Sequence, residues 1–154
     1  MDAIALLKHD HDVVGGLLED LMATTKRGTK TRSELLAKIK QELEIHIHIE
    51  EEIFYPAFKA AGKTSDDDKT YFEALEEHRA AGDLVLADLT RTDPASEQFG
   101  GRAKVLKELI EHHVKEEEKQ MFPRARELMD KDKLAQLGEE LEARKKELKA
   151  GATA

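Results

Sequence analysis

The stretch EIHIHIEEEIFYP, residues 44–56, decides the predicted fold, and EHHVKEEEKQMFP at residues 111–123 repeats its pattern. In each copy a glutamate follows a histidine by four residues, and a proline follows the glutamate by six. The isoleucines at positions 45, 47 and 49 alternate as in a strand, but they lie inside a longer helical pattern with acidic flanks. We therefore predict a helix, in which residues four apart share one face.

Apolar residues recur at intervals of three and four along the chain, which is the period of amphipathic helices. Possible capping boxes begin at Thr31 and Thr64. Breakers follow four long periodic segments, at Arg27–Thr29, Gly62–Ser65, Thr92–Pro94 and Asp130–Asp132. We predict an all-α, up-down-up-down four-helix bundle over residues 1–129, with an additional C-terminal helix and tail at 130–154 on or near it.

Composition narrows the classes of function. The 154 residues carry a formal net charge of −8 and no cysteine. The negative charge argues against nucleic acid and anionic membranes as partners, and the absence of cysteine excludes disulfides, thiolate metal sites and cysteine nucleophiles. The opening MDAIALLKHDHD has no basic leader pattern, and no apolar run reaches bilayer length. We expect one cytoplasmic domain of undetermined oligomeric state, with histidine and carboxylate as its metal-binding side chains.

The repeat extends beyond the two quoted stretches. Its offset is 67 residues, the difference between His46 and His113, and the same shift relates His11 to His78. These correspondences indicate a duplicated helical hairpin and a pseudo-twofold axis between its copies.

Each predicted helix places one histidine on its apolar stripe, and two add a glutamate. The inward set is His11, His46, Glu50, His78, His113 and Glu117. Buried carboxylates without a partner are costly, and a cation would neutralise them. Imidazole and carboxylate together suit iron, zinc or manganese, and two carboxylates suffice to bridge two metals. The pseudo-twofold axis predicts two histidines for each metal. The alternative is a metal-free bundle with hydrogen-bonded core histidines.

Other residues near this face receive separate predictions. His9, His48 and His112 lie on other helix faces and are expected to meet solvent, as is the acidic run that follows Glu50. Asp10 and Glu77 are candidates to orient the inward imidazoles. Pro56 and Pro123 lack an N–H group, so each should bend or end its helix just past the site.

With these residues in view, the chain resembles the hemerythrin-like, or HHE cation-binding, domains over about residues 3–129. The matching segments are HDHDVV, EIHIHIEEEIFYP, EEHRA and EHHVKEEEKQMFP. The resemblance implies a four-helix bundle around a non-haem di-iron centre, that is, two iron ions, held by the six inward residues.

The resemblance also has departures that bear on function. Oxygen-carrying hemerythrins have a further histidine where this chain has Ala74, and they take their last carboxylate one residue later, at the position of Glu118. Tyr71 lies two turns before His78 and is a candidate to approach the centre. We expect a protein that binds or senses O₂ or NO at an open iron position. The alternatives are an oxidoreductase acting on peroxide or NO, with unassigned catalytic residues, and a protein for iron storage or delivery.

Overall fold

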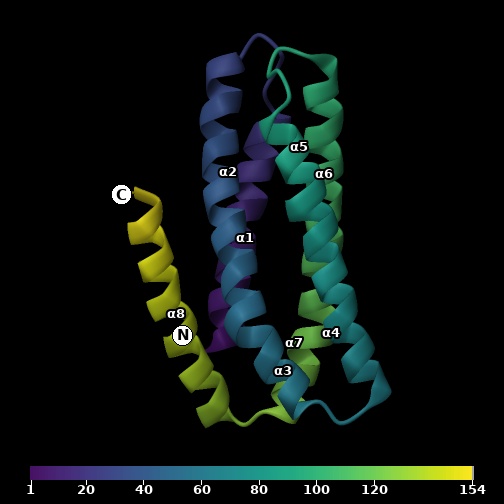
Figure 1. The fold of residues 1–154 in the computed structure, drawn as a ribbon, viewed down its shortest axis with the longest axis vertical. Helices are drawn as coiled ribbons and strands as arrows, with labels where there is room; N and C mark the ends of the chain where they lie inside the picture. Colours follow the sequence, from purple (N-terminus) through teal and green to yellow (C-terminus); the bar gives the residue numbers. More distant parts are fainter. Residues whose placement is uncertain (154) are drawn as a thin grey trace.

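The computed structural model describes residues 1–153, and within that range it is helical without strands. The first hairpin is α1 (Ala3–Met22) followed by α2 (Thr29–Ile49), η1 (Glu50–Phe54) and α3 (Tyr55–Ala61). The second is α4 (Ser65–His78), η2 (Arg79–Leu86) and α5 (Ala87–Thr90), followed by α6 (Glu97–Glu116), η3 (Glu117–Met121) and α7 (Phe122–Leu128). Consecutive long helices run in opposite directions, and α8 (Lys131–Thr153) lies along the outside (Figure 1). The all-α prediction is confirmed.

Side-chain caps fix four helix starts, including that of α8, where Asp130 accepts a hydrogen bond from the Lys133 N–H. Asp2 accepts a hydrogen bond from the Ala5 N–H, Ser96 accepts one from the Phe99 N–H, and Thr64 forms the predicted capping box with Asp67. The box predicted at Thr31 is wrong, because α2 already begins at Thr29 and its start has no side-chain cap. Tertiary contacts hold this end instead, since the buried Arg32 donates to the Pro94 carbonyl and to Thr24 Oγ1.

Neither proline ends its helix. A π-helical turn precedes each one, with the Tyr55 N–H bonded to the Glu50 carbonyl and the Phe122 N–H bonded to the Glu117 carbonyl. The extra residue in such a turn brings positions five apart towards one face. The interruption expected at Pro56 and Pro123 is therefore a local widening at matching places in both hairpins, and the helix continues as α3 or α7.

Two apolar clusters fill the bundle. One includes Leu18, Ile39, Phe99 and Leu106, and the other includes Phe54, Phe58, Phe122 and residues of α8. The buried histidines come from the helices that supply both clusters.

The C-terminal helix α8 packs against α1, α2 and η1. Its buried Leu134, Leu137 and Leu141 join the second cluster, and Lys145 donates to Asp10. Gly138 permits the closest approach, because a Cβ there would meet the Met1 carbonyl oxygen and lie 2.9 Å from the Ala3 nitrogen. The contacts agree with the predicted packing on the bundle, while the division into a domain and a tail at residue 129 stays a prediction. Within the described residues, no helix has the length and apolar character of a membrane span.

Candidate metal centre

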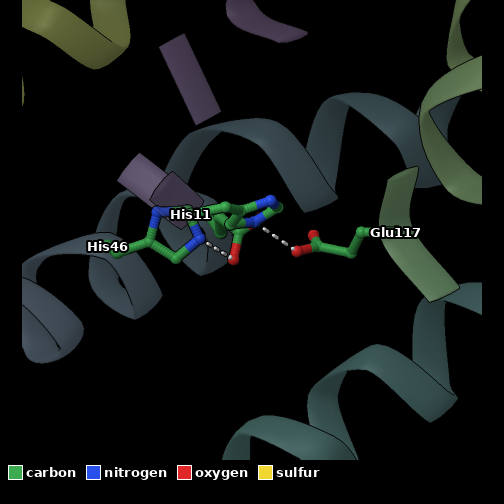
Figure 2. A group of neighbouring side chains, drawn as sticks. His11, His46 and Glu117 are labelled. Atoms are coloured by element: carbon green, nitrogen blue, oxygen red, sulfur yellow. Dashed lines mark hydrogen bonds and ion pairs between the residues drawn. The ribbon is translucent and has the colours of Figure 1, made fainter. Parts of the chain in front are cut away.

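The six predicted side chains meet in one buried layer of the bundle. None of these residues is more than 6% exposed, although they come from four different long helices. Figure 2 shows three of them, His11, His46 and Glu117, approaching from separate parts of the chain. Their ligand atoms form two groups whose members lie within 4.8 Å of one another: His11, His46, Glu50 and Glu117 in one, and Glu50, His78 and His113 in the other.

The two glutamates lie between the histidine pairs. Glu50 Oε1 is 3.0 Å from His46 Nε2 and 3.1 Å from His78 Nε2. Glu117 Oε1 is 3.1 Å from both His11 Nε2 and His113 Nε2. Each carboxylate therefore touches one imidazole of each hairpin, as the pseudo-twofold axis requires. This is the position from which a carboxylate bridges two cations.

A second ring of carboxylates fixes the imidazoles from outside. Every inward histidine has Nδ1 within hydrogen-bond distance of an acid, which leaves Nε2 to face the centre. The pairs are His11 with Glu118 at 2.7 Å, His46 with Asp10 at 3.1 Å, His78 with Glu51 at 2.7 Å and His113 with Glu77 at 2.7 Å.

Asp10 and Glu77 thus have the orienting contacts that were predicted for them. Glu51 is exposed, as expected for that acidic run, but its carboxylate also reaches His78 of the other hairpin, a contact that was not predicted. Glu118 contacts the outer nitrogen of His11, whereas Glu117 faces the centre. Contacts between hairpins depend on how the bundle packs, so the helical period of a single segment could not reveal these two roles.

The electrostatics of this layer show a need for positive charge. Burial opposes the protonated form of His46, but attraction to Glu50 and the contact with Asp10 outweigh it and raise its pKa to about 10. Burial likewise opposes protonation of His113, and Glu117 overcomes it and raises the pKa of that imidazole well above its usual value. Burial would raise the pKa of Glu117, yet His113 holds it well below the ordinary range. Without a metal, the buried carboxylates favour the protonated forms of His46, His78 and His113.

The donor set fits a metal ion. Glu50 Oε2 and His46 Nε2 are buried and make no hydrogen bond within the described residues, although His46 Nε2 lies close to Glu50 Oε1. Orphaned buried polar atoms are rare in native proteins. Ligand bonds of about 2.1 Å place neighbouring octahedral ligands about 3 Å apart, which matches the 3.0–3.1 Å separations around the glutamates. Imidazole nitrogen and carboxylate oxygen together suit iron, manganese or zinc.

Tyr55 is a central residue that the sequence analysis missed. Its hydroxyl donates to Glu117 Oε2 at 2.9 Å and lies 3.1 Å from His78 Nε2 and 3.2 Å from His113 Nε2. Burial, followed by the charges of Glu117 and Glu50, raises its pKa well above the usual value, so the phenol is neutral without a metal. The repeat could have drawn attention to Tyr55. The 67-residue offset pairs it with Phe122, so the first hairpin has a hydroxyl at a position where the second has none.

The remaining predictions near the site have clear outcomes. His9, His48 and His112 are exposed, as expected. Tyr71 does not reach the centre, because it packs edge-on against the ring of Tyr55, 6.5 Å away between centroids. Ala74 is buried and offers no ligand atom.

The fold and this layer together define a class: four-helix-bundle proteins whose buried histidines and carboxylates form clusters able to hold metal. The chain belongs to the hemerythrin family, because the model of the hemerythrin HHE cation binding domain matches residues 2–125.

Individual relatives agree with this assignment. The uncharacterized protein Rv2633c of Mycobacterium tuberculosis is 31% identical over 150 residues, covering 97% of this chain and 88% of that protein. A crystal structure of an HHE cation binding domain-containing protein, the Rv2633c homolog from Mycobacterium kansasii, has a TM-score of 0.85 and 30% identity, covering 99% of this chain and 90% of that chain. A DNA nickase of Nostoc sp. is 24% identical over 143 residues, which are 93% of this chain but 39% of the nickase.

Proposed function

We propose that the protein binds two iron ions in this layer and takes up a small diatomic ligand, O₂ or NO, as a carrier or sensor in the cytoplasm. In this proposal, His11 and His46 hold one ion, His78 and His113 hold the other, and both glutamates bridge. The observation that carries the proposal is the position of Glu50 and Glu117, each within 3.1 Å of one imidazole from each hairpin.

The residues around the centre suit a small neutral ligand. A cavity of about 10 Å³ lies against the four histidines, and Val14, Leu43, Ala81 and Ile110 are among its apolar lining residues. A space of roughly 10–15 Å³ holds one water molecule, so the cavity has room only for a ligand of about that size and excludes an organic substrate. The iron would supply reversible coordination of that ligand. The protein supplies a dry, shaped site and fixed imidazoles.

Tyr55 favours a second candidate, an oxidoreductase that acts on peroxide or NO at the same centre. Its buried hydroxyl contacts Glu117 and both histidines of the second pair, so it is placed to give a proton to a bound reactant. Such a donor can stabilise a bound diatomic ligand by a hydrogen bond, but turnover of peroxide or NO also requires a proton.

Optical spectroscopy of the iron-loaded protein separates the two candidates. Protein loaded anaerobically with Fe²⁺ is exposed in turn to O₂, NO and peroxide, and spectra are recorded before addition and after removal of each. A change that reverses when O₂ or NO is removed supports binding. Continued consumption of peroxide, or of NO when an external electron donor is present, with return of the starting spectrum, supports the enzyme. If iron-loaded protein responds to none of them, both candidates are wrong.

Matched variants test the role of the hydroxyl. Tyr55→Phe should keep both iron ions and lose most turnover if the protein is an oxidoreductase. Tyr71→Phe is the control, because that ring packs on Tyr55 without reaching the centre.

A further inference from the structure

The pseudo-twofold relation between the hairpins is broken at one place on the surface. A cleft opens between α4 and the α6–η3 helix, and its floor includes the buried Glu117 and Ala74. Its volume of about 20 Å³ is enough for one water-sized guest. This cleft joins the surface to a carboxylate of the centre.

The equivalent place in the first hairpin is closed. The 67-residue offset pairs Glu73 with Leu6, Ala74 with Leu7, Glu116 with Ile49 and Gln120 with Ile53. Three of these apolar partners are buried and Ile53 is partly buried, in the cluster that also holds Leu134, Leu137 and Leu141 of α8. Leucine and isoleucine therefore seal one side under α8, where glutamate, alanine and glutamine leave the other side open.

We infer that this cleft is the route by which a hydrated divalent cation enters the centre. The inference rests on the proposed metal-binding function and adds which face the ion crosses. The cleft has room for about one water-sized guest, so the ion must lose most of its hydration water to pass. The buried carboxylate of Glu117 lies at the inner end and can bind the ion there.

The charge of the cleft selects for cations. Glu73, Glu77 and Glu116 all line it, and none of its lining residues is basic. At the rim, Glu73, Glu77 and His112 have ligand atoms within 4.8 Å of one another, so an entering ion meets donors before it reaches Glu117. Acid-lined clefts raise the local concentration of cations, and this effect weakens as salt increases. The sealed side has leucine and isoleucine at the positions of Glu73 and Glu116 and offers no such attraction.

The test measures how fast metal-free protein takes up Co²⁺, by stopped-flow absorbance, with elemental analysis of the end point. Ala74→Leu copies the sealed side and should slow uptake about tenfold without lowering the final metal content. Gln120→Ile copies it at an exposed rim position, where the change should leave the fold intact, and should also slow uptake. Circular dichroism of each metal-free variant checks its fold. If Ala74→Leu does not fold, the uptake rate of Gln120→Ile tests the entry route in its place.

A charge pair provides the matched control. Glu73→Gln with Glu116→Gln should slow uptake about tenfold at low salt and much less at high salt. Glu108→Gln with Glu111→Gln removes the same charge from exposed positions on α6 outside the cleft and should leave the rate unchanged. Wild-type rates in Gln120→Ile and in the Glu73/Glu116 variant would overturn the inference while leaving the metal centre intact. A wild-type protein that binds no Co²⁺ or Fe²⁺ would instead refute the proposed function.

Discussion

Replacing the buried His46 by alanine should lower both stability and metal content, whereas replacing the exposed His48 on the same helix should change neither by much. His46 is 4% exposed, its Nδ1 is 3.1 Å from Asp10 and its Nε2 is 3.0 Å from Glu50. His46→Ala leaves both carboxylates buried without this positive partner. His48, two residues later on the same helix, has a side chain that is 48% exposed and pairs with the exposed Glu52 at 2.6 Å.

The two positions predict effects of different size. Breaking a buried ion pair by removing one partner costs about 3–5 kcal/mol, whereas an exposed pair contributes about 0–1 kcal/mol. For a chain of 154 residues, each kcal/mol shifts the melting temperature by about 2–4 °C. Metal-free His46→Ala should therefore melt about 6–20 °C below wild type, and His48→Ala should melt within about 4 °C of it.

Thermal unfolding followed by circular dichroism measures these shifts, and elemental analysis after iron loading measures metal content. His46→Ala should lose at least one of two irons, and His48→Ala should lose none. Equal melting temperatures and equal metal contents for the two variants would show that His46 is an ordinary core histidine and would refute the ligand assignment.

Three further predictions concern the surroundings of the centre. Lys145→Met should lower the affinity for metal in a competition titration, because Lys145 donates to the Asp10 carboxylate that orients His46. Lys146→Met, at an exposed position, is the control. Equal affinities for the two variants would show that α8 does not influence the metal centre. Gly138→Ala should lower the melting temperature, since a Cβ there collides with the backbone of Met1 to Ala3. A Cβ at Gly16 meets nothing within 4 Å, so Gly16→Ala should be stabilising by about 0.5–1 kcal/mol. A higher melting temperature for Gly138→Ala than for Gly16→Ala would disprove the close packing of α8. The Arg124 guanidinium and the Lys63 and Thr64 N–H groups hold the pKa of Asp67 below its usual 3.8, so Asp67 stabilises the fold fully above pH 4 to 5 and loses that contribution as the pH falls through the lowered pKa. In an acid titration of unfolding, Asp67→Asn should be less stable than wild type at neutral pH and should approach it at low pH; a constant difference at every pH would contradict the pairing.

Much of the fold was accessible from the sequence because two periodic signals agree. The helical period marks the inward face, and the 67-residue offset marks which inward histidines are equivalent, so the sequence alone placed His11 and His78 in one layer with His46 and His113. Local chemistry also identified the start of α4, where the side chains of Thr64 and Asp67 each accept a hydrogen bond from the backbone N–H of the other residue.

The parts that escaped prediction depend on contacts between hairpins or on departures from the repeat. Glu51 and Glu118 look like surface acids in their own helices, and only the packed bundle brings them to His78 and His11. Tyr55 faces the centre because the π turn of η1 moves position 55 towards the face of Glu50, which ordinary helical spacing does not predict. The start of α2 has no side-chain cap and is held by contacts of Arg32 with Thr24 and Pro94, so the capping box predicted at Thr31 was wrong.

The central claim is most directly tested by anomalous diffraction at the iron absorption edge from crystals of iron-replete protein. We predict two peaks per chain, one bonded to His11 and His46 and the other to His78 and His113, with Glu50 and Glu117 between them. A single peak, a peak away from these histidines, or glutamates turned to solvent would contradict the account.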